Sequence, residues 1–104
     1  MKRIRVVAGG GYNQFGQRNT VERIAHAIQS ITDWAVVTIG GLTIYKSHGA
    51  WKAPNGEIVY ENGLVFEYVG NDDLLAQEFA RRIRDGFDQQ SVLLTVENVE
   101  AFFV

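Results

Sequence analysis

The stretch LTIYKSHGAWKAPNGEIVYENGLVFEYV, residues 42–69, has the pattern of two long strands that fold back on each other. Residues 42–47 and 57–69 are rich in β-branched and aromatic residues, with one irregularity at Asn62-Gly63. Pro54-Asn55-Gly56 between them is a turn signal. We therefore predict a central hairpin with a broad connecting loop.

Before this hairpin the chain predicts one strand and one helix. Residues 4–8 are a short β-branched run that Gly9-Gly10-Gly11 ends. A helix begins at Asn19 or Thr20, because residues 19–22 resemble a capping box, and its pattern ends at Asp33. Residues 34–39 read as strand that Gly40-Gly41 interrupts before residue 42. The apolar face of this helix is predicted from helical spacing as Val21, Ile24, Ala25, Ile28 and Ile31.

After the hairpin the chain predicts a second helix and a last strand. Leu75, Phe79, Ile83 and Phe87 recur every four residues, so a helix is expected over about residues 72–87. Residues 91–96 form the last clear strand pattern. The last part of this helix holds Arg81, Arg82 and Arg84. Basic residues there interact favourably with the helix dipole, and they are also candidates to bind a phosphate.

The resulting order is β-α-β-β-α-β within one domain spanning residues 1–104. The handedness rule for crossover connections then favours a ferredoxin-like fold of the α+β class. Two helices would cover one face of a four-stranded antiparallel sheet and leave the other face open. The first and third strands would be central neighbours, so Arg5 and Glu67 are expected to pair across them.

The open face would be mixed in character, because side chains alternate along strands. It would carry Arg5 and Glu67 among apolar groups. A surface this apolar is expected to be covered by a partner or a ligand and not left exposed to solvent. We favour a homodimer or higher homo-oligomer that covers it over a ligand-binding sheet, because closed twofold dimers are common. The apolar groups expected there are Val7, Tyr45, Val65, Val69 and Leu93.

Composition excludes several classes of protein. The chain has 104 residues, no cysteine and a formal net charge of -2, so disulfide and thiolate chemistry are excluded and general nucleic-acid binding is disfavoured. With two histidines and scattered carboxylates, no metal site and no cofactor is expected. The apolar run at residues 6–8 is too short for a signal peptide, so a cytoplasmic location is expected, in the host cytoplasm for a phage protein.

The Gly-rich segment 9–18 lies between a strand and a helix, where backbone N–H groups can hold an anion. Gly11 and Gly16 have the spacing of a phosphate-binding loop, but Gln17 and Arg18 replace its lysine and hydroxyl residue. Gly10, Gly11 and Arg18 are therefore candidate ligand contacts. A flexible connection is the favoured alternative, since lone glycine motifs are weak signals.

The central hairpin concentrates residues that suit ring stacking and polar contact. His48 carries the only imidazole expected in this loop. The alternative for Trp51 is that it plugs the edge of the core, and for Glu61 that it binds loop N–H groups. The candidate ligand-binding residues of the hairpin are Thr43, Tyr45, Lys46, His48, Trp51, Tyr60 and Glu61.

Residues 41–44, 49–51 and 56–61 resemble a family of small bacterial proteins of unknown function. That family reads roughly G-L-T, G-x-W and G-x-I-x-x-E along its central hairpin, and residues 90–93 are similar to its closing strand. Short uncharacterised phage proteins have similar segments. The resemblance covers about residues 40–104 and implies that Thr43, Trp51 and Glu61 are shared positions. Many of those relatives are secreted, whereas no signal peptide is expected in this chain, which also differs by its Gly-rich first loop.

The leading functional hypothesis is a non-enzymatic homo-oligomer that binds a small anionic or nucleotide-like ligand. Its rings would stack on the hairpin aromatics, and Arg18, Lys46 or the late-helix arginines would meet a phosphate. A phage protein that sequesters a host immune signal would have a binding site of this kind. One alternative is a small dimeric enzyme that uses His48 with Glu61 or Glu67. Another is an inhibitor module that docks on a partner protein through the open sheet.

Overall fold

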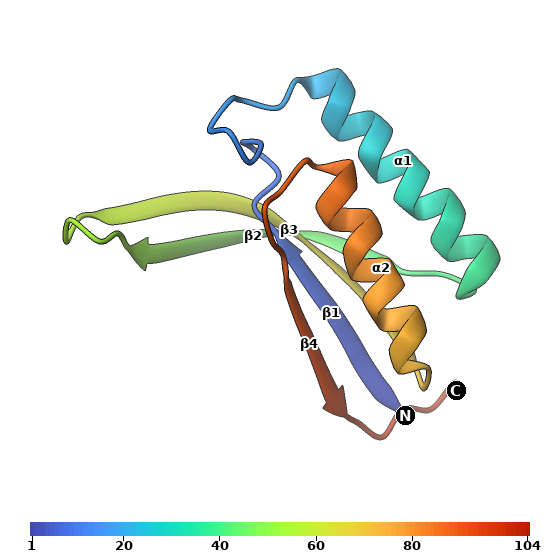
Figure 1. Cartoon of the computed structure of the whole chain (residues 1–104). Helices are drawn as coiled ribbons and strands as arrows, with labels where there is room; N and C mark the ends of the chain where they lie inside the picture. The colour runs from blue at the N-terminus through green and yellow to red at the C-terminus, as the bar shows by residue number, and fades with distance from the viewer.

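Two helices lie on one face of a four-stranded sheet in the computed structural model, which describes all 104 residues (Figure 1). The strand order is β2-β3-β1-β4, and every neighbouring pair is antiparallel. The predicted ferredoxin-like β-α-β-β-α-β arrangement is therefore confirmed. The elements are β1 (Lys2–Ala8), α1 (Val21–Thr38), β2 (Thr43–Lys52), β3 (Ile58–Gly70), α2 (Asp73–Gly86) and β4 (Leu93–Asn98).

Helix α1 extends through the run that was predicted to be strand, so that prediction is wrong. Residues 34–38 are helical, and the N–H groups of Ile39 and Gly40 both donate to the carbonyl of Ala35, at 2.8 and 2.9 Å. Asp33 does not end the helix. Ala35 is fully buried against the core, and this packing outweighs the strand propensity of the exposed Val36 and Val37.

The start of α1 lies one residue later than a cap at Asn19 would place it. Thr20 is the N-cap, because its Oγ1 accepts a hydrogen bond from the N–H of Arg23 at 3.1 Å. Asn19 is instead buried and donates through Nδ2 to the carbonyls of Gly10 and Phe87, at 2.9 and 3.1 Å. The polar residue before the helix thus joins the Gly-rich loop to the end of α2.

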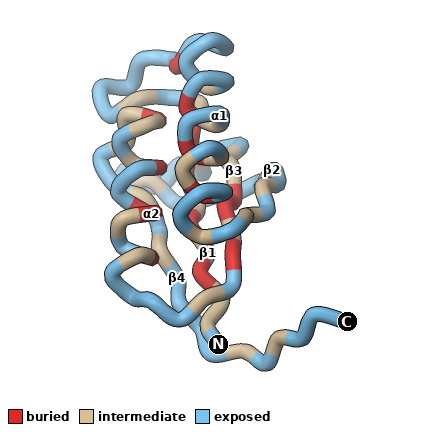
Figure 2. The backbone as a smooth tube through the Cα atoms, turned by 90° about the vertical axis from the view of Figure 1, so that its right-hand side faces the viewer, coloured by how far each residue is buried: buried red, intermediate tan, exposed pale blue.

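The core lies between the helices and the sheet, where buried segments of both layers meet (Figure 2). Phe79 is its centre: it stacks on Trp34 at 6.2 Å and meets Tyr68 edge to face at 5.1 Å between ring centroids. The buried face of α1 is rotated from the predicted one. Val21 and Ala25 are exposed, and the residues that α1 buries are Ala27, Ile31 and Ala35.

The open face of the sheet carries the predicted pair of charges. Arg5 lies opposite Glu67, and its Nε donates to Glu67 Oε2 at 2.9 Å. The hydroxyl of Tyr45 donates to the same oxygen at 2.9 Å. Val65, which pairs with Val7 and Tyr45 in the register, is only 4% exposed, whereas Leu93 is 61% exposed. One part of the open face is therefore buried within the chain itself, and another part is exposed to solvent.

Strands β2 and β3 continue well beyond the rest of the sheet as a two-stranded ribbon. β1 ends at Ala8, opposite Leu64, while β2 and β3 remain paired out to Lys52 and Ile58. Figure 1 shows this ribbon projecting away from the helices. Neither helix combines the length and the apolar character needed to cross a membrane.

Candidate functional site

The Gly-rich loop after β1 is a closed, hydrogen-bonded unit. Asn13 Oδ1 accepts from the N–H groups of Phe15 and Gln17 at 2.9 and 3.0 Å, and the N–H of Asn13 donates to the carbonyl of Gln17 at 2.7 Å. Tyr12 and Arg18 form a β-bridge at its base. This network does not match the flexible connection favoured for a lone glycine motif.

The bend after α2 holds this loop in place. Gln14 donates from its backbone N–H and from Nε2 to the carbonyl and the Oδ1 of Asp88, at 2.6 and 2.7 Å. Gln89 Nε2 donates to the carbonyls of Tyr12 and Phe87. Asp88 has a φ of 51°, which a residue with a side chain adopts at a cost. Residues 87–89 therefore fix the position of the loop through these hydrogen bonds.

An open groove of about 550 Å³ lies between the Gly-rich loop and the base of the β2–β3 ribbon. In Figure 1 the blue loop after β1 lies over this ribbon, on the same side of the sheet as the helices. The volume falls within the range of small-molecule sites. We call it the tyrosine groove; it is lined by Gly9, Gly11, Tyr12, Asn13, Arg18, Tyr60, Glu61, Asn62 and Gln89.

The tyrosine groove offers two ring faces and two opposite charges. The side chains of Tyr12 and Tyr60 are 61% and 78% exposed, so their rings are available to a ligand. Arg18 and Glu61 take part in none of the ion pairs of the structure. The groove thus has one unpaired guanidinium and one unpaired carboxylate.

A second hollow, of about 450 Å³, opens on the sheet face away from the helices. The register places Ser47, Gly49, Glu61 and Gly63 on that face, and Glu61 also borders the tyrosine groove. We call it the serine hollow; it is lined by Val7, Ala8, Gly9, Ser47, Gly49, Glu61, Gly63, Gln89, Ser91, Val92 and Leu93.

The imidazole of His48 lies beside this site. Its Nδ1 is 2.6 Å from Asn62 Oδ1, and it borders a hollow of about 140 Å³ together with Tyr60 and Glu61. Glu67 is bound to Arg5 and borders no hollow with His48. His48 therefore shares a hollow with Glu61 and not with Glu67.

The remaining predicted residues lie elsewhere. Gly10 is buried with a φ of 63°, and its carbonyl holds Asn19. Thr43 borders a separate hollow of about 510 Å³ near Glu67, and Tyr45 is engaged with Glu67 as described above. Lys46 and Trp51 border none of these hollows.

Trp51 lies on the ribbon with 49% of its surface exposed, so it does not plug the edge of the core. The four predicted residues that meet in the tyrosine groove are Gly11, Arg18, Tyr60 and Glu61.

Five residues of the tyrosine groove were not among the predicted site residues: Gly9, Tyr12, Asn13, Asn62 and Gln89. Tyr12 and Asn13 belong to the Gly-rich segment that was recognised, so their polar and aromatic character was the available signal. Gln89 carries no such signal, because only the pairing of β4 with β1 brings the end of α2 to the loop.

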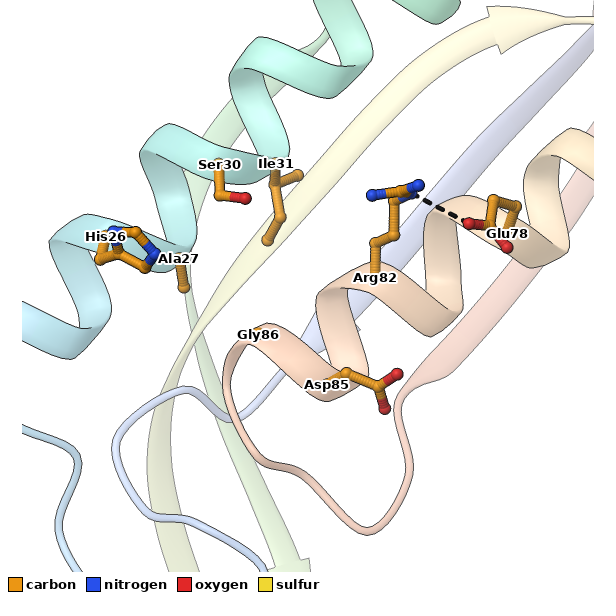
Figure 3. A pocket seen from close by; sticks show the side chains of 8 residues that line it. All are labelled: His26, Ala27, Ser30, Ile31, Glu78, Arg82, Asp85 and Gly86. Carbon is orange, nitrogen blue, oxygen red and sulfur yellow. Dashed lines mark ion pairs between the residues drawn. The ribbon is translucent and has the colours of Figure 1, made fainter.

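The late-helix arginines do not reach this site. Arg82 pairs with Glu78 at 3.0 Å (Figure 3). It also lies over the Trp34 ring, 4.7 Å from the ring centroid. Arg81 pairs with Glu78 at 3.3 Å, and Arg84 with Asp85 at 2.9 Å. The hollow of about 440 Å³ between α1 and α2 is bordered by His26 and Arg82, away from the tyrosine groove.

No family model and no curated protein matches the sequence. Two solved structures of a phage SAM lyase resemble the fold. The one in complex with S-methyl-5'-thioadenosine has a TM-score of 0.60 and 17% identity, covering 92% of this chain and 79% of that chain. The apo structure has a TM-score of 0.60 and 15% identity, covering 92% and 78%. The four-stranded sheet with two helices described here is thus a fold that a phage lyase also adopts.

Proposed function

We propose that this chain binds a small nucleoside-like molecule in the tyrosine groove. The observation that carries the proposal is the meeting of two exposed tyrosine rings with an unpaired guanidinium and an unpaired carboxylate. Tyr12 and Tyr60 offer flat faces on which a nucleobase stacks. Arg18, Asn13 and Asn62 offer donors and acceptors for its polar edges.

The charges of the groove narrow the class of ligand. Arg18 is the only cation that lines it, and Glu61 on the ribbon is the only anion. A polyphosphate would bring several negative charges toward this carboxylate, which costs binding energy. The groove therefore favours a neutral or zwitterionic nucleoside over a nucleoside triphosphate.

The comparison with solved structures supports the same class of ligand. A phage SAM lyase of this fold is known in complex with S-methyl-5'-thioadenosine. We infer that the present chain is a phage protein that acts on a small signalling or cofactor-type nucleoside of the host, working as a homo-oligomer in the host cytoplasm. The similarity of hairpin segments to those of short phage proteins points the same way.

Isothermal titration calorimetry tests the proposal with S-methyl-5'-thioadenosine, adenosine and ATP. We expect the two nucleosides to bind more tightly than ATP. Tyr60→Ala should weaken both by roughly tenfold, since one stacked base contributes on the order of 1–3 kcal/mol. Trp51→Ala is the matched control, because this ring lies on the same ribbon outside the groove. Equal affinity in both variants, or no binding up to millimolar nucleoside, would refute the proposal.

A lyase is the second candidate function, favoured by the fold neighbour and by the unpaired Glu61 beside His48. Incubation of the chain with SAM, followed by chromatography and mass spectrometry, would detect released S-methyl-5'-thioadenosine. Glu61→Gln should abolish the release, and His48→Ala should reduce it. Binding of SAM without release of S-methyl-5'-thioadenosine would exclude the lyase and support the non-enzymatic proposal.

A further inference from the structure

The tyrosine groove and the serine hollow adjoin at three residues: Gly9, Glu61 and Gln89. The first hollow lies on the helix side of the ribbon and the second on the open side of the sheet. They meet where β1 ends and β2 and β3 continue alone. The groove and the hollow therefore lie next to each other around the end of β1.

Gly9 keeps the junction between the two spaces open. A Cβ built on Gly9 would lie 3.3 Å from Gln89 Oε1 and 3.7 Å from Glu61 Oε2. A side chain at this position would therefore fill the space between the two polar groups. With hydrogen alone at residue 9, the amide and the carboxylate both border the junction.

The serine hollow has a chemistry of its own. Glu61 is the one charged residue among those that line it, and Ser47 and Ser91 add hydroxyl groups. Val7 and Leu93 supply apolar surface. A short apolar chain that ends in a cation matches this lining, because its methylene groups meet the valine and leucine and its charge meets the carboxylate.

We propose that the serine hollow holds a positively charged arm attached to the 5' position of the nucleoside in the tyrosine groove, with Glu61 selecting the charge. This inference rests on the proposed function, since it assigns the second half of the same ligand. Tyr12 and Tyr60 bind the base, and Glu61 stands at the junction where the arm leaves the sugar. A neutral nucleoside occupies only the first half of the site.

Calorimetry with three thioethers of 5'-thioadenosine tests the inference. S-methyl-5'-thioadenosine has a neutral arm, the S-(3-aminopropyl) compound has a cationic arm, and the S-(2-carboxyethyl) compound has an anionic arm. We expect the aminopropyl compound to bind about tenfold more tightly than the methyl compound, and the carboxyethyl compound more weakly than both. Glu61→Gln should remove this order of affinities, so that the aminopropyl compound loses its advantage over the carboxyethyl compound.

Gly49→Val provides a steric test at the wall of the hollow that β2 forms opposite Glu61. A Cβ on Gly49 would lie 3.9 Å from the nearest atom, the carbonyl oxygen of Glu61, and valine suits a strand, so this variant is expected to fold. It should weaken the aminopropyl compound and spare the methyl compound.

The failures of the two proposals are distinguishable. If the methyl compound binds and the three arms bind equally, or if Gly49→Val weakens all three compounds alike, the arm site is refuted and the proposed function stands. If none of the three compounds binds, both are refuted.

Discussion

Two neighbouring residues of β3 differ in how their polar atoms are satisfied. Glu67 lies on the open face, where Arg5 and Tyr45 both donate to its carboxylate. Tyr68 lies on the helix side, where its hydroxyl is buried without a hydrogen-bond partner. Because an unsatisfied buried group costs stability and a satisfied one does not, replacement of these two side chains should have opposite effects.

Tyr68→Phe is expected to stabilise the fold by up to about 1 kcal/mol at neutral pH, because it removes the orphaned hydroxyl and keeps the ring against Phe79. Burial, with a smaller effect from Asp72, raises the pKa of Tyr68 above its ordinary 10.0. The unfolded chain therefore ionises first as the pH rises through about 10, and stability falls there. Urea unfolding at pH 7 and at high pH should show that fall reduced in the variant; a large loss of stability at pH 7 would contradict this.

Glu67→Gln tests the pair of charges on the open face. The hydrogen bond from Arg5 is the main cause that lowers the pKa of Glu67 below its ordinary 4.5, and Tyr45 adds to it. The stability from this pair is fully present above the ordinary pKa and is lost as the pH falls through the lowered one. The free energy of unfolding, measured between neutral and acid pH, should therefore depend less on pH in the variant. Identical pH dependence in both proteins would rule the effect out.

Among the elements, α2 was predicted best and α1 worst. Turn residues and β-branched runs predict a hairpin from local sequence alone, and β3 lies where the pattern put it. Strand β2, however, continues to Lys52 instead of ending at residue 47, so the predicted broad loop is wrong. The end of α1 depends on Ala35 packing against a core formed by distant residues, which local propensity does not contain. Likewise, Arg18 and Glu61 were predicted as separate candidates, while their meeting in one groove follows from the topology.

Gly63→Ala tests why the ribbon departs from the sheet at this position. A Cβ on Gly63 would lie 2.7 Å from the carbonyl oxygen of Ala8 and 2.9 Å from Ser47 Oγ, so the backbone of β1 or β3 must shift. We expect a loss of about 1–3 kcal/mol in denaturant unfolding. Gly49→Ala on the same ribbon is the control, since its Cβ meets only ordinary contacts and should be nearly neutral. Equal effects of the two substitutions would contradict the close approach.

The whole molecule is elongated, with a longest extent of 46 Å against 29 and 24 Å for the other two axes. Much of that length is the ribbon, which has no core beneath it and exposes Trp51 and Ile58. An isolated two-stranded hairpin is marginally stable in water, so contact with a second copy would stabilise it. The homo-oligomer expected from the sequence remains a prediction on this ground.

Native mass spectrometry and analytical ultracentrifugation check that prediction. We expect a defined oligomer for the natural chain and a shift toward monomer for Trp51→Glu, because a carboxylate disfavours burial of the ribbon between copies. Circular dichroism should show the secondary structure of the variant unchanged. A natural chain that sediments as a monomer at micromolar concentration would disprove it.

The chain has two tryptophans, and they occupy contrasting surroundings: Trp34 is stacked on Phe79 beneath Arg82, whereas Trp51 lies on the solvated ribbon. Intrinsic fluorescence therefore has two separable origins. In a Trp34→Phe background, the emission wavelength and acrylamide quenching would report the surroundings of the ribbon alone. Ordering of the β2–β3 ribbon can therefore be followed in solution without any attached dye.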